Sequence, residues 1–233
     1  MIKTIFPSKD ATLYEHTASM NTGLDPILEI RKDISGSGGD LMRSRAVIQF
    51  DTTTVSASLS EQGINTGSDS GSLKYFLKMF ISKEEDVPAE YSIVIHPIRE
   101  AWDMGTGKFT SDPIVTNGCS WTNKAPEQAW TDTGGYFFTG SAISESAIQT
   151  FTNVAGDIDL DVTDMVEAIH SGIKNNFGFI IKRSGSQETN STEYGSLAYY
   201  SRETNTIYSP RLEARYVNAD LLFNTAVTGS VVT

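Results

Sequence analysis

The chain has 233 residues, of which 39% are hydrophobic and 20% are charged, so it contains enough apolar material to fold around a core. Its 18 basic and 29 acidic residues give a formal net charge of −11, which repels phosphate backbones and anionic membrane surfaces. We therefore expect no direct binding to nucleic acid or to a membrane. Because Cys119 is the only cysteine, the chain cannot form an internal disulfide.

The segment from Met1 to Pro7 contains neither a long apolar core nor a small-residue cleavage site, so we expect no secretory signal and synthesis in a cytoplasm. The sequence also contains no run of apolar residues long enough to span a bilayer. A chain of this length suits one large β-sandwich. We expect a single domain over residues 1–217, followed by a C-terminal extended arm or extra strand over residues 218–233.

Alternating hydrophobicity predicts a protein built mainly of strands. In the clearest strand, Ala46, Ile48 and Phe50 share one face and Arg45 lies on the other. In chain order, the pattern predicts strands at 26–32, 44–51, 73–83, 91–99, 157–162, 176–183, 196–201 and 210–217.

Segments rich in glycine and serine, 35–39 and 58–72, predict exposed loops, and residues 102–135 predict a long, partly ordered connection. One short helix is expected after residue 162, with Thr163 as its cap, Asp164 in its first turn and Gly172 at its end. Many strands with one short helix and long loops predict an all-β protein, an antiparallel jelly-roll β-sandwich.

Several polar groups invite a catalytic or metal-binding interpretation, but each has a structural alternative that we favour. Asp157, Asp159 and Asp161 could bind a structural Ca²⁺, or form the solvated face of a strand. Glu100 and Asp103 could be a glycosidase pair, or anchor a loop. The sequence lacks a nucleophile elbow, a phosphate-binding glycine loop and a zinc-ligand spacing, so we expect no enzyme, no catalytic residue and no cofactor. Whether a metal binds stays open.

Short motifs follow one another in a characteristic order along most of residues 8–217. They are Asp10-Ala11-Thr12-Leu13-Tyr14, Asn21-Thr22-Gly23, Ser44-Arg45-Ala46-Val47-Ile48-Gln49-Phe50-Asp51, Trp102-Asp103-Met104-Gly105-Thr106-Gly107, Ser120-Trp121-Thr122-Asn123, Asp161-Val162-Thr163-Asp164-Met165-Val166, Asn175-Asn176-Phe177-Gly178-Phe179-Ile180-Ile181, Tyr200-Ser201-Arg202-Glu203 and Ser209-Pro210-Arg211-Leu212-Glu213. Taken together, these motifs resemble the DNRLRE-type, or disaggregatase-related, jelly-roll family.

The resemblance implies one of two functions. Proteins resembling this family include virion structural proteins of bacteriophages and carbohydrate-binding modules attached to large secreted enzymes. Because the chain shows no signal peptide and no attached catalytic domain, we expect a virion structural or assembly protein of a tailed bacteriophage, as a decoration, neck, tail or fibre component. Its partners would then be other virion proteins or copies of itself. The alternative is a carbohydrate-binding protein that recognises a polysaccharide such as a host surface glycan.

Specific residues follow from these hypotheses. Arg45 is expected to be partly buried and paired with a carboxylate, and Asp51, Thr163 and Asp164 to have structural roles. Trp102 and Trp121 are expected to pack beside each other and close one end of the sandwich, or to form a platform for sugar rings. In the C-terminal segment, Leu221, Leu222, Phe223 and Val227 are too apolar for a solvated tail. They are expected to pair with a sheet edge of a neighbouring subunit, or to fold back on their own domain.

Overall fold

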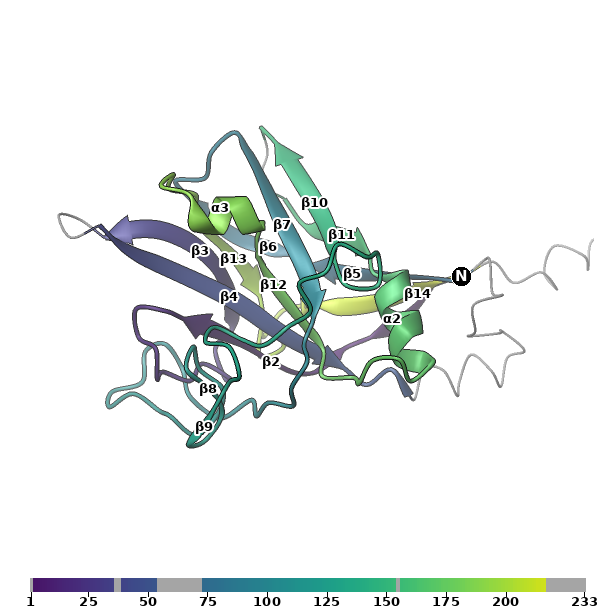
Figure 1. Ribbon diagram of the computed structural model, residues 1–233, viewed down its shortest axis with the longest axis horizontal. Helices are drawn as coiled ribbons and strands as arrows, with labels where there is room; N and C mark the ends of the chain where they lie inside the picture. Colours follow the sequence, from purple (N-terminus) through teal and green to yellow (C-terminus); the bar gives the residue numbers. More distant parts are fainter. Residues whose placement is uncertain (1, 36–38, 54–72, 154–155, 217–233) are drawn as a thin grey trace, which may run out of the picture.

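Two antiparallel β-sheets lie face to face and form most of the molecule (Figure 1). The computed structural model describes residues 2–35, 39–53, 73–153 and 156–216. The smaller sheet has four strands in the order β1 (Ile2–Ile5), β14 (Arg211–Arg215), β5 (Lys74–Met79) and β11 (Ile158–Asp161). The all-β sandwich expected from the alternating pattern is confirmed.

The larger sheet has eight strands. Seven follow the order β10 (Ala147–Thr152), β7 (Glu90–Pro97), β12 (Phe179–Arg183), β4 (Asp40–Phe50), β3 (Ile27–Ser35), β13 (Gly195–Tyr200) and β6 (Ile81–Glu85), and the eighth, β2 (Pro7–Tyr14), pairs with β4. The long strand β4 uses its first residues to pair with β3 and its remaining residues to pair with β2. A small hairpin of β8 (Asn123–Ala125) and β9 (Gln128–Ala129) stands apart from both sheets.

At two phenylalanines the chain passes from one sheet to the other within a single residue. Phe6 separates β1 from β2, and Phe80 separates β5 from β6, and in each case the two strands belong to different sheets. The prediction of one strand over residues 73–83 is therefore wrong. Its apolar face, with Tyr75 and Met79 buried, continues through the bend. The alternating hydrophobicity of residues 73–83 correctly showed which face of the segment is buried. It could not show which neighbouring strands the segment pairs with.

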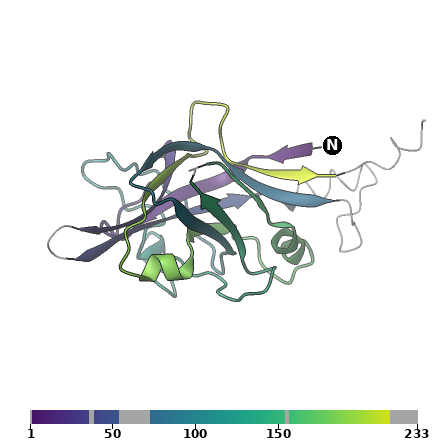
Figure 2. The ribbon, with the colours of Figure 1, turned by 90° about the horizontal axis from the view of Figure 1, so that it is seen from above.

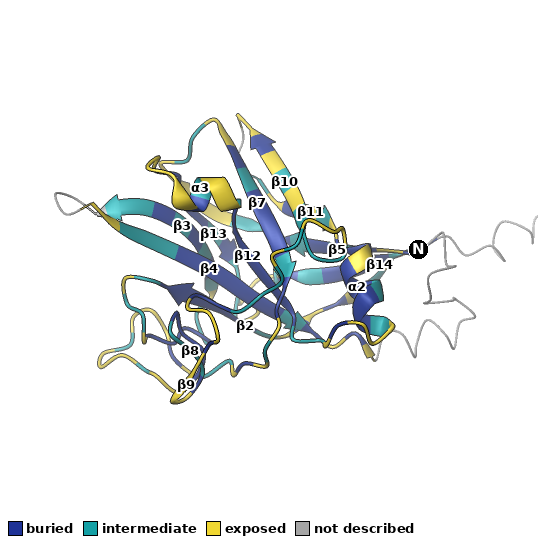
Figure 3. Ribbon diagram, viewed as in Figure 1, coloured by how far each residue is buried: buried dark blue, intermediate teal, exposed yellow. Residues whose placement is uncertain are grey.

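The main apolar core lies between the two sheets, whose strands carry many buried residues (Figure 3). Ala46, Ile48 and Phe50 of β4 point into it, as the alternating pattern predicted, and they meet residues of the smaller sheet such as Leu77 and Leu212. The opposite face of β4 carries Val47, which belongs to a second apolar cluster on the outside of the larger sheet. The larger sheet is thus covered on both faces.

The predicted helix exists as α2 (Thr163–His170), and its buried Met165, Val166 and Ile169 pack on the main core. Thr163 is not its cap, which corrects the prediction, because the helix begins at Thr163 and the preceding residue is Val162. The Thr163 hydroxyl instead accepts a hydrogen bond from Tyr75 N at 2.9 Å and donates one to Asp161 Oδ1 at 2.5 Å. These bonds tie the helix to the smaller sheet. Asp164 lies exposed in the first turn, and Gly172 follows the helix with a φ of 74°.

A second helix, α3 (Gly185–Thr189), lies on the outer face of the larger sheet. Viewed from above, the light-green α3 lies on the side of the molecule opposite the purple β1 and the yellow β14 (Figure 2). Five residues are too few to show a helical hydrophobic period, and the sequence did not predict this element. In the described part of the chain, no helix has the length and apolar character required to cross a bilayer.

Candidate functional site

The outer face of the larger sheet is covered by the connection between β7 and β10. Four residues of the sheet, Ala11, Leu13, Val47 and Ile180, form the floor of the second apolar cluster. Trp102, Trp121 and Trp130 of the connection belong to the same cluster. This long segment, which is poor in regular structure, is therefore packed onto the sheet by aromatic side chains.

Burial contradicts the sugar-platform alternative for Trp102 and Trp121 and supports packing, although not at the expected place. Trp102 is 2% exposed and Trp121 is 5% exposed, so neither indole offers a face on which a sugar ring could stack. Both lie in the second cluster, outside the larger sheet, and not at an end of the core between the sheets. Among the described aromatic contacts, Trp102 and Trp121 do not stack on each other. They meet cations instead: Lys9 Nζ lies 4.4 Å from the Trp102 ring centre, and the Arg45 guanidinium lies 4.8 Å from that of Trp121.

Asn21 fixes the path of this connection. Its side chain is fully buried, and Nδ2 donates to Met104 O at 2.7 Å and to Cys119 O at 2.8 Å. Its Oδ1 accepts a hydrogen bond from Gly107 N at 2.8 Å. A Cβ at Gly105, where φ is 74°, would lie 2.3 Å from Asn21 Oδ1, so this close approach requires glycine. The asparagine and glycine motifs of the sequence therefore act together to order a loop.

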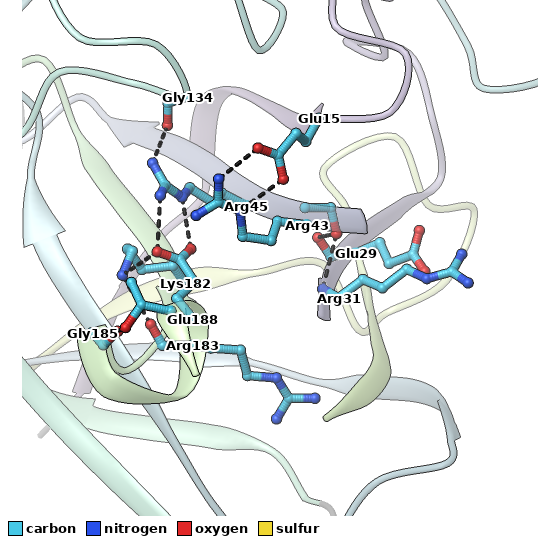
Figure 4. Close-up of polar contacts among 12 residues, drawn as sticks. Glu15, Glu29, Arg31, Arg43, Arg45, Gly134, Lys182, Arg183, Gly185 and Glu188 are labelled. Atoms are coloured by element: carbon cyan, nitrogen blue, oxygen red, sulfur yellow. Dashed lines mark hydrogen bonds and ion pairs between the residues drawn. The ribbon is translucent and has the colours of Figure 1, made fainter. Parts of the chain in front are cut away.

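Arg45 lies at the centre of a buried charged network on the same face (Figure 4). Its Nε and Nη2 donate to the two carboxylate oxygens of Glu188 at 2.7 and 2.8 Å, and its Nη1 donates to Gly134 O at 2.7 Å. Lys182 Nζ of β12 lies 2.8 Å from Glu188 Oε2. The prediction that Arg45 is buried and paired with a carboxylate is confirmed, since Arg45 is 8% exposed.

The electrostatics of the network favour the charged form of its single carboxylate. Burial by itself raises the pKa of Glu188, but Arg45 and Lys182 outweigh that effect and hold the pKa below its usual value. Burial lowers the pKa of Lys182, and Glu188 opposes the shift. Both carboxylate oxygens bond to cations of the same chain, so the chemistry of this group is structural. It fastens α3 and the covering connection, through Gly134, to β4 and β12.

Glu100 and Asp159, which the sequence also singled out, bond to other residues of the protein. Glu100 accepts hydrogen bonds from Thr131 N and Oγ1 and forms an ion pair with Lys124 at 3.2 Å. Glu100 therefore anchors a loop, which is the alternative we favoured. Asp159 pairs with Arg215 at 2.7 Å. Within the ranges that the structure describes, no group of three or more His, Cys, Asp or Glu residues could hold a metal ion.

Two further predictions concern single residues and the C-terminal segment. Asp51 is exposed, and its Oδ1 accepts hydrogen bonds from Thr53 N at 3.0 Å and Thr53 Oγ1 at 2.6 Å, so it holds the backbone just after β4. The proposed assembly residues Leu221, Leu222, Phe223 and Val227 lie outside the described residues.

A partly exposed group of side chains, most of them aromatic, surrounds Phe80, where the chain changes sheets. We define the aromatic surface as Phe80, Tyr200 and Tyr208 with the neighbouring Ile207 and Arg211. Tyr208 stacks on Tyr200 with ring centres 5.7 Å apart, and its ring lies 5.4 Å from Phe80, over which the Arg211 guanidinium sits at 4.8 Å. Ile207 is 82% exposed and Tyr208 is 45% exposed. The next residues along the chain, Ile81 to Glu84, line an open cavity of about 260 Å³.

The sequence matches none of the protein-family models with which it was compared, and the comparison with curated proteins gives no match either.

Proposed function

We propose that the chain is a non-enzymatic structural protein of a tailed-phage virion, made in the host cytoplasm and assembled into the particle as a decoration, neck, tail or fibre component. The observation that carries the proposal is the aromatic surface, which we assign as a contact with another protein subunit of the same particle. The resemblance of the sequence motifs to DNRLRE-type jelly rolls supports the same function.

The composition of the aromatic surface suits a protein partner. Tyrosine and arginine are enriched among the residues that contribute most to protein–protein affinity, because they combine a large apolar area with a polar group. An exposed apolar side chain such as Ile207 loses its contact with water when a partner covers it, at about 25 cal/mol for each Å² of apolar area. Phe80, Tyr200 and Tyr208 hold one another in position, so little side-chain freedom would be lost on binding.

The rest of the described structure provides a rigid support for such a contact. The covering connection is fixed by Asn21 and by the buried tryptophans, and the Arg45 network fastens α3 and Gly134 to the sheet. Partners that bind through a preformed surface avoid the entropy cost of ordering it. This is the property that a repeated structural subunit needs.

Proteomic analysis of purified phage particles tests the location. We expect the chain in intact particles at a stoichiometry of many copies or of one ring. If the protein is abundant in infected cells but absent from intact particles, the proposal is wrong.

A matched pair of variants tests the surface. The double variant Ile207→Ser/Tyr208→Ser should fold normally but enter particles at least tenfold less than the native chain. The control Ile173→Ser, which changes an isoleucine that is 77% exposed elsewhere, should enter normally. A polysaccharide is the competing ligand for the aromatic surface, because sugar rings also stack on tyrosines. Two results together would show that the aromatic surface binds a glycan and not a protein. The native chain would be retained on a glycan array and the double variant would not, while the double variant would still enter particles normally.

A further inference from the structure

The edges of the two sheets differ in how they are protected. An edge strand turns alternate main-chain N–H and C=O groups away from its own sheet, and proteins usually guard such edges with charge, a bulge or a cover. In the described part of the chain, the edge strands of the two sheets are β1, β2, β6, β10 and β11. Strand β6 is guarded by the exposed Lys83, Glu84 and Glu85 and by a shift of register opposite Ala198 and Tyr199.

Side chains of the protein cover the edges of β2, β10 and β11. The Thr22 hydroxyl accepts a hydrogen bond from Thr12 N of β2 at 3.0 Å and donates one to Thr12 O at 2.8 Å. Gln149 of β10 donates from Nε2 to Asp157 O at 3.1 Å, and its Oε1 accepts from Asp159 N of β11 at 3.0 Å. The edges of β10 and β11 therefore face each other, and that of β2 is closed by Thr22.

Strand β1 shows none of these protections in the described chain. It pairs with β14, beside which it lies at the end of the smaller sheet (Figure 2). Its register is unbroken, it contains no proline, and Lys3 is its single charged residue. Ile2 is 62% exposed, and Phe6, which follows the strand, is 60% exposed. An apolar edge of this kind is a template on which another strand can pair.

The C-terminal part of the chain leaves the smaller sheet close to this edge. In the pairing of β14 with β1, Arg215 lies opposite Ile2, so the chain emerges beside the beginning of β1. To reach the free edge it crosses β1 alone, a span of two strand spacings or about 10 Å. About three extended residues cover that distance. Residues 217–233 lie outside the described residues, and their number leaves ample chain for a strand.

The composition of residues 218–233 suits the edge of β1. The segment contains no Lys, Arg or Glu, and it carries Leu221, Leu222 and Phe223 in succession. These apolar side chains match the exposed Ile2 and Phe6, and each Å² of apolar area that they cover contributes about 25 cal/mol. A segment tethered this close has a high effective concentration at its own edge, which favours the same chain over a second copy.

We propose that the free edge of β1 is a strand-binding surface and that residues 218–233 of the same chain occupy it. Because β14 runs toward Ile2, a segment that turns back beside β1 runs parallel to β1. Main-chain hydrogen bonds to β1 hold the added strand, and Leu221, Leu222 and Phe223 supply the apolar cover. The inference does not involve the aromatic surface, so the proposed function can fail without affecting it.

Amide hydrogen exchange of the full-length chain, resolved by residue with NMR, tests this edge. Pairing with β14 protects only alternate amides of β1, because the others point away from β14. With an added strand, the successive amides from Lys3 to Ile5 should all be protected. Nuclear Overhauser effects should also connect backbone protons of β1 with those of residues 218–233. Both results should be unchanged when the protein is diluted, since the strand belongs to the same chain.

A matched pair of variants locates the cover. The triple variant Leu221→Asp/Leu222→Asp/Phe223→Asp keeps the length of the segment but removes its apolar side chains. The outward-pointing amides of β1 should then exchange about tenfold faster or more, while those that face β14 keep their protection. The control Ile207→Ser/Tyr208→Ser changes the aromatic surface and should leave the exchange of β1 as in the native chain.

The outcomes separate the C-terminal segment from other covers of β1. Protection of alternate amides alone in the native chain overturns the proposal. Protection that is lost on dilution also overturns it, because a second copy then occupies the edge. Unchanged exchange in the folded triple variant has the same consequence. If the triple variant fails to fold, the Overhauser effects of the native chain decide, and their absence between β1 and residues 218–233 shows that the proposal is wrong.

Discussion

Glu188→Gln gives the sharpest test of how the outer face of the larger sheet is held together. The substitution keeps the size of the side chain but removes the single negative charge between two cations. The side chains involved are nearly dry, with exposed fractions of 10% for Arg45 and 5% for Lys182 and Glu188. Two buried cations would then face each other without a counter-charge.

The expected loss is large because the remaining charges cannot be hydrated in place. Removing one partner of a buried ion pair costs about 3 to 5 kcal/mol. Since Glu188 serves two cations, we expect a loss near the upper end, about 5 kcal/mol, in the free energy of unfolding. A domain is typically stable by about 5 to 15 kcal/mol, so the variant should be close to unfolding at room temperature.

Chemical denaturation at pH 7, followed by the fluorescence of the buried tryptophans, measures this loss. The matched control is Glu15→Gln, which breaks the ion pair to Arg43. The side chain of Arg43 is 21% exposed and that of Glu15 is 24% exposed. Partly solvated pairs of this kind contribute about 0 to 1 kcal/mol. If Glu188→Gln and Glu15→Gln lose equal amounts, the buried network does not fasten the covering layer and our account of it is wrong.

The pH dependence of the same variant provides an independent check. The pKa of Glu188 is lowered below 4.5 in the folded chain by Arg45 and Lys182, which overcome the opposing effect of burial. The stability that the ionised carboxylate contributes is therefore present above pH 4.5 and is lost as the pH falls through the folded-state pKa. The difference between the native chain and Glu188→Gln should shrink as the pH falls below 4.5 toward the lowered folded-state pKa. A difference that grows as the pH falls would contradict the assignment.

Three further predictions concern buried polar groups. Burial raises the pKa of Asp10 to about 7, against the opposing hydrogen bond from Arg202 N, so the fold favours protonated Asp10 and should lose stability as the pH rises from about 4 to 7. Asp10→Asn should remove that trend and be more stable than the native chain at pH 8 in chemical denaturation. Asn21→Ala should lose about 3 kcal/mol, roughly 1 for each of its three hydrogen bonds to the main chain, and should speed proteolytic cleavage between residues 105 and 118. Cys119 is fully buried and burial raises the pKa of its thiol, so a thiol reagent should label it only after denaturation. Rapid labelling of the native chain would show that the covering layer opens.

Strands were predictable where apolar and polar side chains alternate in the sequence, and β4, β7 and β13 were all found in this way. The strand β2 was missed because its sequence does not alternate clearly: polar Asp10 and Thr12 are buried along with Ala11 and Leu13. Burial on both faces follows from the second apolar cluster, whose existence depends on the distant connection. The sequence pattern could not reveal that cover.

The charged network shows the same limit for a site. The position of Arg45 on the mixed face of a strand predicted burial and a carboxylate partner. It could not identify Glu188, which lies 143 residues away on a helix of five residues. Trp102 and Trp121 pack in the second apolar cluster, but an indole that stacks on sugar and one that packs on a sheet have the same sequence signature. Only their burial distinguishes the two.

The two sheet changes at Phe6 and Phe80 determine how the molecule can open. Because β1 continues into β2 and β5 continues into β6 after a single residue, the two sheets are joined at these points by the shortest connections between them. Neither sheet can therefore detach as a separate leaflet while the other stays intact. Protected amides in the centres of both sheets should exchange with solvent hydrogen through one common opening reaction, with the same dependence on denaturant, so that the sandwich behaves as a single cooperative unit.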